Sequence, residues 1–132
     1  SGKLLTPSQA FALKGFQFDE DWTPAIEAGT RVGFVNVPML ATSVGGSLRY
    51  YFNGNAIGIF CVAGPDAAVI SYRIDRGEWK ELDTYTEWSE GLYIPWVYML
   101  GEDLPEGMHS LEIKVPTEGE RRGCVIRNFV VN

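Results

Sequence analysis

The sequence predicts an all-β protein, folded as a single antiparallel β-sandwich domain over residues 1–132. Three observations lead to this fold class. From residue 31 onward, apolar and polar residues alternate with a period of two, which places every second side chain on one face of a strand. Clusters of Gly, Pro, Asn and Asp separate these runs, and a helical period is almost absent. Roughly seven or eight short strands divided by turns are typical of a sandwich.

The first part of the alternating region predicts three strands. Residues 31–37 form the first, and residues 47–52 form the second after a break at two glycines. Residues 53–55 read Asn-Gly-Asn, which predicts a tight hairpin turn because Asn and Gly tolerate positive φ. The hairpin would return through residues 56–62, which are apolar on both faces, as expected for a strand in the middle of a sandwich.

The second part predicts strands at residues 69–75, 78–82, 108–115 and 124–131, with the first two joined by a turn at Asp-Arg-Gly. Residues 83–105 are less regular, and we expect loops there. Alternation assigns a common set of side chains to the interior. They are Leu48, Tyr50, Phe52, Ile70, Tyr72, Ile74, Leu111, Ile113 and Val115.

Residues 1–30 allow two interpretations, a linker to a neighbouring domain or an edge segment of the sandwich. Pro7 and Pro24 interrupt this stretch, and a short turn of helix is expected near residues 8–13. Its aromatic residues are expected to cover one end of the sandwich. They are Phe11, Phe16, Phe18 and Trp22.

Composition and charge exclude several functional classes. The net charge is −6, and Arg121–Arg122 is the only adjacent basic pair, so we expect no nucleic-acid partner. An acidic surface disfavours anionic membranes, and no apolar run approaches the ~20 residues of a membrane-spanning helix. No charged start followed by an apolar stretch marks a signal peptide. A neutral or cationic ligand would be tolerated.

The two cysteines, Cys61 and Cys124, lie in apolar segments predicted as strands. We expect two buried free thiols, which behave as small hydrophobic side chains. A disulfide between two strands is the alternative that the sequence leaves open. Neither cysteine belongs to a C-x-x-C motif, which argues against a zinc site or a redox pair.

One pair of short motifs suggests an esterase. Gly-Gly-Ser-Leu at residues 45–48 resembles the Gly-Asp-Ser-Leu nucleophile block of SGNH/GDSL hydrolases, and Glu-Gly-Met-His at residues 106–109 resembles their Asp-x-x-His block. The chemistry would be attack by Ser47 activated by His109. We reject this site because Gly46 stands where the motif has Asp, and because Ser47 leads into an alternating strand instead of a strand-to-helix turn. No catalytic residue is predicted.

Carboxylates are frequent between the strands, and we interpret them as a solvated acidic face rather than as a glycosidase pair. They are Glu78, Glu81, Asp83, Glu87 and Glu90. No cofactor is predicted. A structural calcium ion held near the turns by Asp75 and Asp83 is the alternative, although no D-x-D-x-D-G loop is present.

Aromatic residues concentrate in the irregular stretch, at residues 83–98, and predict a ligand surface. Flat, weakly solvated rings stack on the C–H faces of sugars, so at least one of Trp88 and Trp96 should be exposed to solvent. The alternatives are that the rings belong to the core or that they dock another domain. The residues predicted to bind ligand are Tyr85, Trp88, Tyr93 and Trp96, with Arg73 and Glu87 bonding hydroxyl groups.

The stretch from residue 58 to 79 resembles the galactose-binding-like β-sandwich modules attached to bacterial SGNH/GDSL-type hydrolases. It contains the Gly-Pro-Asp-Ala turn and the Tyr-x-Ile-Asp strand end that these modules share. Further matches follow in order, namely Trp-Ser at residues 88–89, Leu-x-x-Pro at 92–95, Leu-x-x-Gly-x-His-x-Leu at 104–111 and Phe-x-Val-Asn at 129–132. The chain departs from the pattern at Ala68 and Arg76, where Gly is common.

The resemblance covers about residues 45–132 and implies a jelly-roll fold and a non-catalytic accessory module. It further implies that the partner is a carbohydrate or an adjacent hydrolase domain, and that the protein is secreted or periplasmic in a bacterium. A module that only packs on the hydrolase domain, without a ligand of its own, is the first alternative. A free-standing esterase using Ser47 and His109 is the second.

Overall fold

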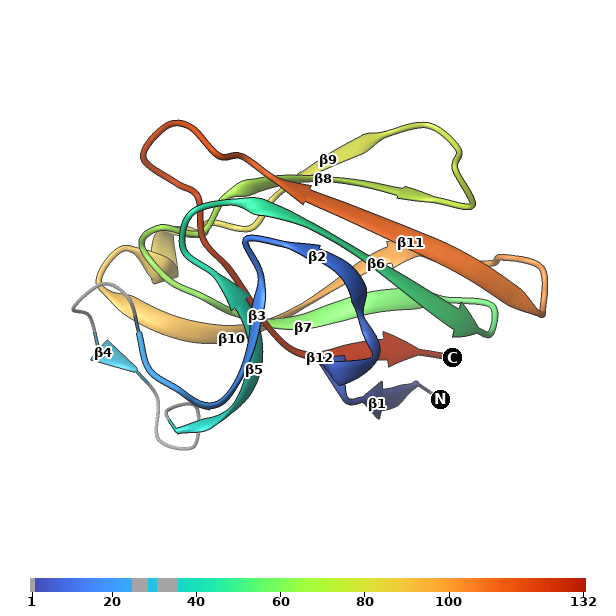
Figure 1. The fold of residues 1–132 in the computed structure, drawn as a ribbon, viewed down its shortest axis with the longest axis horizontal. Coiled ribbons are helices and arrows are strands. Elements are labelled where there is room, and N and C mark those ends of the chain that lie inside the picture. Colours follow the sequence, from blue (N-terminus) through green and yellow to red (C-terminus); the bar gives the residue numbers. More distant parts are fainter. Residues whose placement is uncertain (1, 25–28, 31–35) are drawn as a thin grey trace.

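The computed structural model describes residues 2–24, 29–30 and 36–132, and in this part of the chain two β-sheets pack as a sandwich (Figure 1). The larger sheet has seven strands, in the order β3 (Gln17–Trp22), β5 (Val37–Thr42), β12 (Cys124–Val131), β7 (Ile57–Ala63), β10 (Leu92–Gly101) and β4 (Gly29–Thr30), with β1 (Lys3–Leu5) also pairing with β12. The smaller has five, in the order β2 (Phe11–Lys14), β6 (Gly46–Asn53), β11 (Met108–Val115), β8 (Val69–Ile74) and β9 (Lys80–Asp83). All described pairs are antiparallel except β10 with β4.

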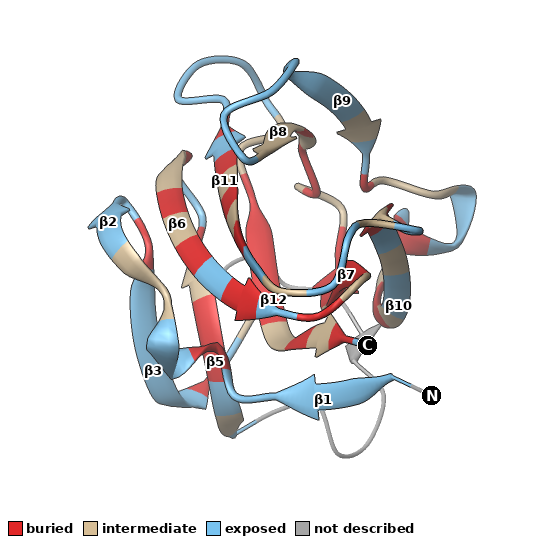
Figure 2. Ribbon diagram, turned by 90° about the vertical axis from the view of Figure 1, so that its right-hand side faces the viewer, coloured by how far each residue is buried: buried red, intermediate tan, exposed pale blue. Residues whose placement is uncertain are grey.

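The main core lies between the two sheets, where the buried residues of the central strands face each other (Figure 2). Its centre is the ring of Phe129 from the larger sheet, which stacks on Tyr50 from the smaller sheet with a centroid distance of 3.8 Å. The side chains that alternation assigned to the interior all belong to this core or pack against it, so that prediction is confirmed.

A second apolar cluster covers the outer face of the larger sheet. Met39, Val62 and Val125 occupy strand positions next to residues of the main core, so their side chains point to the opposite face. Trp22 closes this cluster and meets the ring of Tyr93 edge-on at 5.5 Å between centroids. Residues 56–62 are therefore apolar on both faces because both faces of β7 are covered, as the sequence predicted.

The predicted hairpin at residues 53–55 is wrong. β6 ends at Asn53 in the smaller sheet and β7 begins at Ile57 in the larger sheet, so the chain crosses between sheets here. The connecting residues form hydrogen bonds with segments outside β6 and β7. Gly54 N–H donates to Gly107 O at 3.0 Å, and Asn55 N–H donates to Asn132 O at 2.6 Å. The turn residues predicted a change of direction, but they carry no information about which strand lies alongside.

The predicted turn between the strands at 69–75 and 78–82 is a true hairpin joining β8 and β9. Asp75 and Arg76 both have positive φ, at 53° and 59°, and Gly77 N–H donates to Ile74 O at 3.0 Å. Two successive residues with positive φ match the twist of the flanking strands. Arg76 adopts this conformation where the resembling modules often have Gly.

The expectation of loops across residues 83–105 is wrong for its second half, which forms the ten-residue strand β10. Before it, residues Glu87–Ser89 form the 3₁₀ turn η2. Burial along β10 does not alternate, since Tyr93 and Ile94 are both buried whereas Trp96 and Val97 are both exposed. β7 runs along most of β10, and the described residues of β4 pair with Leu92 and Tyr93. Pro95 lies two residues beyond the described pairing with β4.

Residues 3–22 contribute strands to both sheets. β1 pairs with β12, β2 with β6 and β3 with β5, and the expected helical turn is the 3₁₀ segment Pro7–Gln9 (η1). Of the aromatic residues, Phe16 and Trp22 are buried, whereas Phe18 is exposed. The strand predicted at residues 31–37 lies mostly outside the described residues, and β5 begins at Val37.

Candidate functional site

Trp88 is presented to solvent by the turn η2, whose ends are tied together by polar contacts. Ser89 N–H donates to Thr86 O at 2.9 Å, and the Thr86 and Ser89 hydroxyl groups lie 3.2 Å apart. Ser89 is completely buried, so the turn is anchored on one side while the neighbouring indole projects from the other. Trp88 is 64% exposed, which confirms that at least one of the two tryptophans faces solvent.

Trp96 lies on β10, in register with Cys61 of β7, and is 42% exposed. Cys61 S–H donates to the Trp96 carbonyl at 3.5 Å, which fastens the strand at this position. Together the two indoles line a hollow of about 330 Å³, whose remaining walls are Leu92, Ile94 and Pro95. The tryptophans therefore share one surface, built on a turn and a strand that are both fixed by hydrogen bonds.

Two further predicted residues lie close to Trp88 in sequence but outside the walls of this hollow. Glu87 belongs to η2 and is exposed to solvent. Tyr85 is half-buried, and the Arg121 guanidinium lies over its ring at 5.2 Å from the centroid. One face of Tyr85 is thus occupied, and we retain it only as a neighbour of the site.

The structure corrects the placement of Tyr93 and Arg73. Tyr93 is 1% exposed, beneath Trp22, and its hydroxyl donates to Asp66 at 3.2 Å, so its ring cannot present a face to a ligand at the surface. Arg73 lies on the outer face of the smaller sheet, where it binds both carboxylate oxygens of Glu112. It does not line the tryptophan hollow.

Sequence reasoning missed Leu92, Ile94 and Pro95 as walls of the hollow. The first and last were noticed only as a structural Leu-x-x-Pro motif, and a strand was not expected there. With these residues the hollow is mostly apolar and has the size range and lining of small-molecule sites. An apolar floor with two exposed aromatic faces suits a ligand with flat C–H faces.

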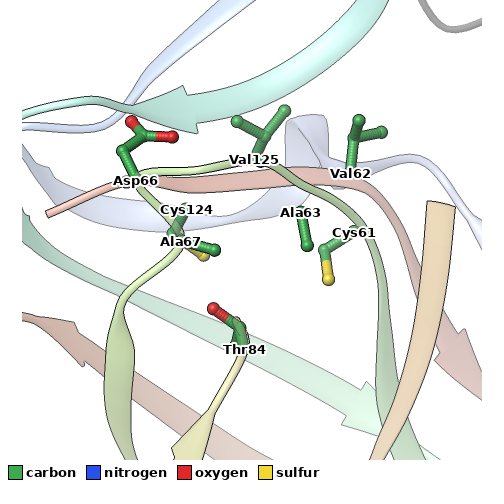
Figure 3. Close-up of a pocket in the computed structure, with 10 residues that line it drawn as sticks. Cys61, Val62, Ala63, Asp66, Ala67, Thr84, Cys124 and Val125 are labelled. Carbon is green, nitrogen blue, oxygen red and sulfur yellow. The ribbon is translucent and has the colours of Figure 1, made fainter. Parts of the chain in front are cut away.

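The two cysteines are both buried, as predicted, and their thiols are free (Figure 3). They line a hollow of only about 10 Å³, too small for a ligand larger than one water. Cys61 is in register with Ile126, two residues beyond Cys124, so the thiols are diagonal neighbours on adjacent strands. Diagonal Cα atoms lie about 7–8 Å apart, beyond the usual span of a disulfide. Burial raises the pKa of both thiols, that of Cys124 to about 12.

The geometry argues against an esterase pair. Ser47 is in register with Lys114 near one end of β11, whereas His109 lies near the other end, about 16 Å away at the spacing of a strand. Ser47 also shares the outer face with Lys114, while His109 is buried beside the ring of Phe52. Gly46, which replaces the Asp of the hydrolase motif, lies against the backbone of Lys14 and Gly15, where a side chain has no room.

His109 has a structural role instead. Its Nδ1 lies 2.5 Å from Asp75 and its Nε2 lies 2.5 Å from the Pro105 carbonyl, so both ring nitrogens face acceptors. These two bonds raise the pKa of His109. Desolvation opposes ionisation of Asp75, but hydrogen bonds from His109 and from Ser110 N–H lower the pKa of its carboxyl on balance. His109 therefore joins the β8–β9 hairpin to the loop before β11, and both contacts favour its ionised form.

Stability should consequently fall as the pH rises. A histidine with a raised folded pKa contributes fully below its unfolded pKa of about 6.5, and the contribution is lost as the pH passes through the folded pKa. We expect the urea midpoint of unfolding to decrease from pH 6 to pH 9, and we expect His109→Gln to flatten this decrease. Equal pH profiles for the two proteins would contradict the role assigned to His109.

The residues considered for calcium already have partners. Asp75 binds His109, and Asp83 accepts two bonds from Arg121, the shorter at 2.7 Å, which lower the pKa of its carboxyl. Within residues 2–24, 29–30 and 36–132, no three His, Cys, Asp or Glu side chains gather as metal ligands would. Over the same residues, no helix is long and apolar enough to cross a membrane.

Comparison with known proteins relates the chain by fold. No family model and no curated protein matches the sequence. Among solved structures, a two-domain esterase (CEX) active on acetylated mannans superimposes with a TM-score of 0.71 at 15% identity, covering 99% of this chain and 36% of that one. A family two carbohydrate esterase from Cellvibrio japonicus gives 0.65 at 11%, covering 99% and 32%. CBM35 from Paenibacillus barcinonensis gives 0.57 at 11%, covering 100% and 98%.

These likenesses define the class of fold. The chain spans about a third of the length of the two esterases and nearly the whole of the CBM35 domain. The protein is thus an all-β sandwich with a jelly-roll fold, which it shares with the CBM35 domain and with part of two larger carbohydrate esterases.

Proposed function

We propose that this protein is a non-catalytic carbohydrate-binding module, and that the hollow between Trp88 and Trp96 is its ligand surface. The observation that carries the proposal is the pair of exposed indoles lining one apolar hollow on an anchored scaffold. Exposed aromatic side chains grouped in this way are uncommon on soluble proteins and mark sites of interaction. The fold shared with a CBM35 domain and with carbohydrate esterases supports the same ligand class.

The test is a paired measurement of glycan binding and stability. Affinity electrophoresis of the protein against mannan, acetylated mannan, galactan and xylan should show retardation by at least one polymer. Trp88→Ala and Trp96→Ala should each weaken that binding tenfold or more, about 1.4 kcal/mol. Because Trp88 is largely exposed, Trp88→Ala should change the free energy of unfolding by less than about 1 kcal/mol; Trp96 is 42% exposed, and Trp96→Ala should cost no more than about 2 kcal/mol.

The matched control is Phe18→Ala, which removes an exposed aromatic ring on β3, outside the hollow. Binding by this variant should equal that of the unchanged protein. If no polymer is retarded, or if both tryptophan variants lose several kcal/mol of stability, the hollow is not a sugar site and the proposal fails.

A docking role is the second candidate, and one observation favours it. Away from the cluster closed by Trp22, the outer face of the larger sheet carries an apolar row in which Leu4 is in register with Val130, Val130 with Gly58, and Gly58 with Met99. Leu4 and Met99 are exposed, and Val97 beside them is exposed as well. Under this proposal the row packs on an adjacent hydrolase domain of a secreted or periplasmic bacterial enzyme. Binding of a glycan by the isolated chain separates the two candidates.

A further inference from the structure

The outer face of the smaller sheet carries a row of side chains unlike the rest of this acidic protein. Phe11, Arg49, Glu112 and Arg73 stand in register across β2, β6, β11 and β8. Arg73 binds Glu112 through Nε at 2.6 Å and through a second nitrogen at 3.2 Å. Both carboxylate oxygens of Glu112 therefore accept hydrogen bonds from Arg73, on the β8 side.

Arg49, on the other side of Glu112, is left without an ion pair among the described residues. Its guanidinium lies over the ring of Phe11 at 5.6 Å from the centroid, and Phe11 in turn packs on Tyr51 at 4.9 Å. The Nε atom of Arg49 is buried and has no hydrogen-bond partner within the part of the chain that the structure describes. A buried guanidinium donor without a partner is costly unless a ligand or water satisfies it.

Trp79 borders the same face from the strand connection between β8 and β9. Arg73 lies 4.6 Å from its ring centroid, and the Lys114 ammonium lies 4.4 Å away. These cation–π contacts hold the indole over the sheet. They also keep the two cations at a fixed place instead of leaving them free in solvent.

Between these groups the surface is hollowed by about 150 Å³. Its walls include Trp79 and the side chains of three cations, Lys14, Arg49 and Lys114, against the single carboxylate of Glu112. The whole chain carries a net charge of −6, so a local excess of positive charge here is not a consequence of composition. Cations converging on one hollow raise the local concentration of an anion.

We infer that this hollow is a second binding site, separate from the tryptophan hollow, and that it takes the carboxylate of an acidic sugar residue. Arg49 and Lys114 donate to the carboxylate from neighbouring strands, Lys14 closes the site from β2, and the edge of Trp79 covers the sugar ring. An arginine that is planar, fixed by Phe11 and lacking its own acceptor is suited to a carboxylate. The two sites would let one module bind a polysaccharide that carries both neutral and acidic residues.

The test is calorimetric titration of the protein with trigalacturonate, with its methyl ester and with sodium acetate, at low salt. Trigalacturonate should bind saturably, and the neutral ester should bind at least tenfold more weakly. Arg49→Gln and Lys114→Gln should each weaken trigalacturonate tenfold or more, while their melting temperatures show that they fold. Lys3→Gln, which removes a cation from β1 in the other sheet, should leave binding unchanged.

Several results would overturn the inference. The first is equal affinity for trigalacturonate and its methyl ester, and the second is an equal loss of affinity in Lys3→Gln and Arg49→Gln. The third is displacement of trigalacturonate by acetate at equal concentration. The fourth is the absence of saturable binding below about 20 mM, which is far weaker than a specific site requires. Trp88→Ala should leave trigalacturonate binding intact. This measurement distinguishes the second site from the proposed function, since binding at one hollow can be lost while binding at the other is retained.

Discussion

Replacement of Phe129 by Ala should lower the free energy of unfolding by about 3–5 kcal/mol. Phe129 is 0% exposed, and its ring stacks on Tyr50 of the opposite sheet at 3.8 Å, so the truncation opens a cavity where the two sheets meet. The surrounding strands are held by their ladders and cannot collapse fully into the space. Urea unfolding followed by tryptophan fluorescence should show the loss, together with a melting temperature lower by roughly 10–20 °C.

Phe18→Ala is the control for Phe129→Ala, because it removes the same atoms from the surface of the same sheet. Its cost should stay below about 1 kcal/mol. Similar losses in the two variants would mean that Phe129 is not at the centre of the core, and the arrangement of the sheets would have to be revised.

Gly45→Ala should be strongly destabilising. Gly45 has φ of +79°, and a Cβ atom there would collide with the Pro116 carbonyl. The residue cannot turn away, since its N–H donates to Arg122 O at 2.9 Å and its carbonyl accepts a bond from the Thr42 hydroxyl at 2.8 Å. We expect a loss of about 3 kcal/mol or more, beyond the 1–2 kcal/mol of left-handed strain alone.

Gly119→Ala separates strain from collision. Gly119 has a similar φ of +90°, but no atom lies within 4 Å of the added Cβ. This variant should therefore show the cost of the backbone conformation by itself, about 1–2 kcal/mol. If Gly45→Ala costs no more than Gly119→Ala, the close approach of the β6 and β11 ends does not constrain residue 45.

Two kinds of strand could be predicted from sequence. β6 and β11 were placed to within about one residue because alternation reports burial on one face directly. β7 and β12, which are apolar on both faces for much of their length, were placed as closely from their apolar runs and the turns that bound them. β10 was missed because its buried and exposed positions do not alternate, and because Trp22, which covers Tyr93, comes from a distant part of the chain. Strand partners were also beyond reach, so the turn at residues 53–55 was assigned to a hairpin although β6 and β7 belong to different sheets.

The candidate site also contains residues that the sequence could predict and residues that it could not. The sequence placed Trp88 and Trp96 in one aromatic segment, and both prove to be exposed. It also included Tyr93, because nothing in the local pattern shows that Trp22 covers this ring from β3. Arg73 was correctly placed on an outward face, but its partner Glu112 lies on a neighbouring strand, and only strand register reveals that pairing.

The rates at which the two buried thiols are modified would report transient opening of the sandwich. A thiol reagent attacks the thiolate, so cysteines with raised pKa values and no solvent contact are modified only when their strands part. Cys61 is bonded to the carbonyl of Trp96, so its modification rate would follow breathing of the β7–β10 seam beside the tryptophan hollow. Cys124 is in register with Thr42 and would follow the β5–β12 seam. A glycan bound at the tryptophan hollow would slow the modification of Cys61 and leave the modification rate of Cys124 unchanged.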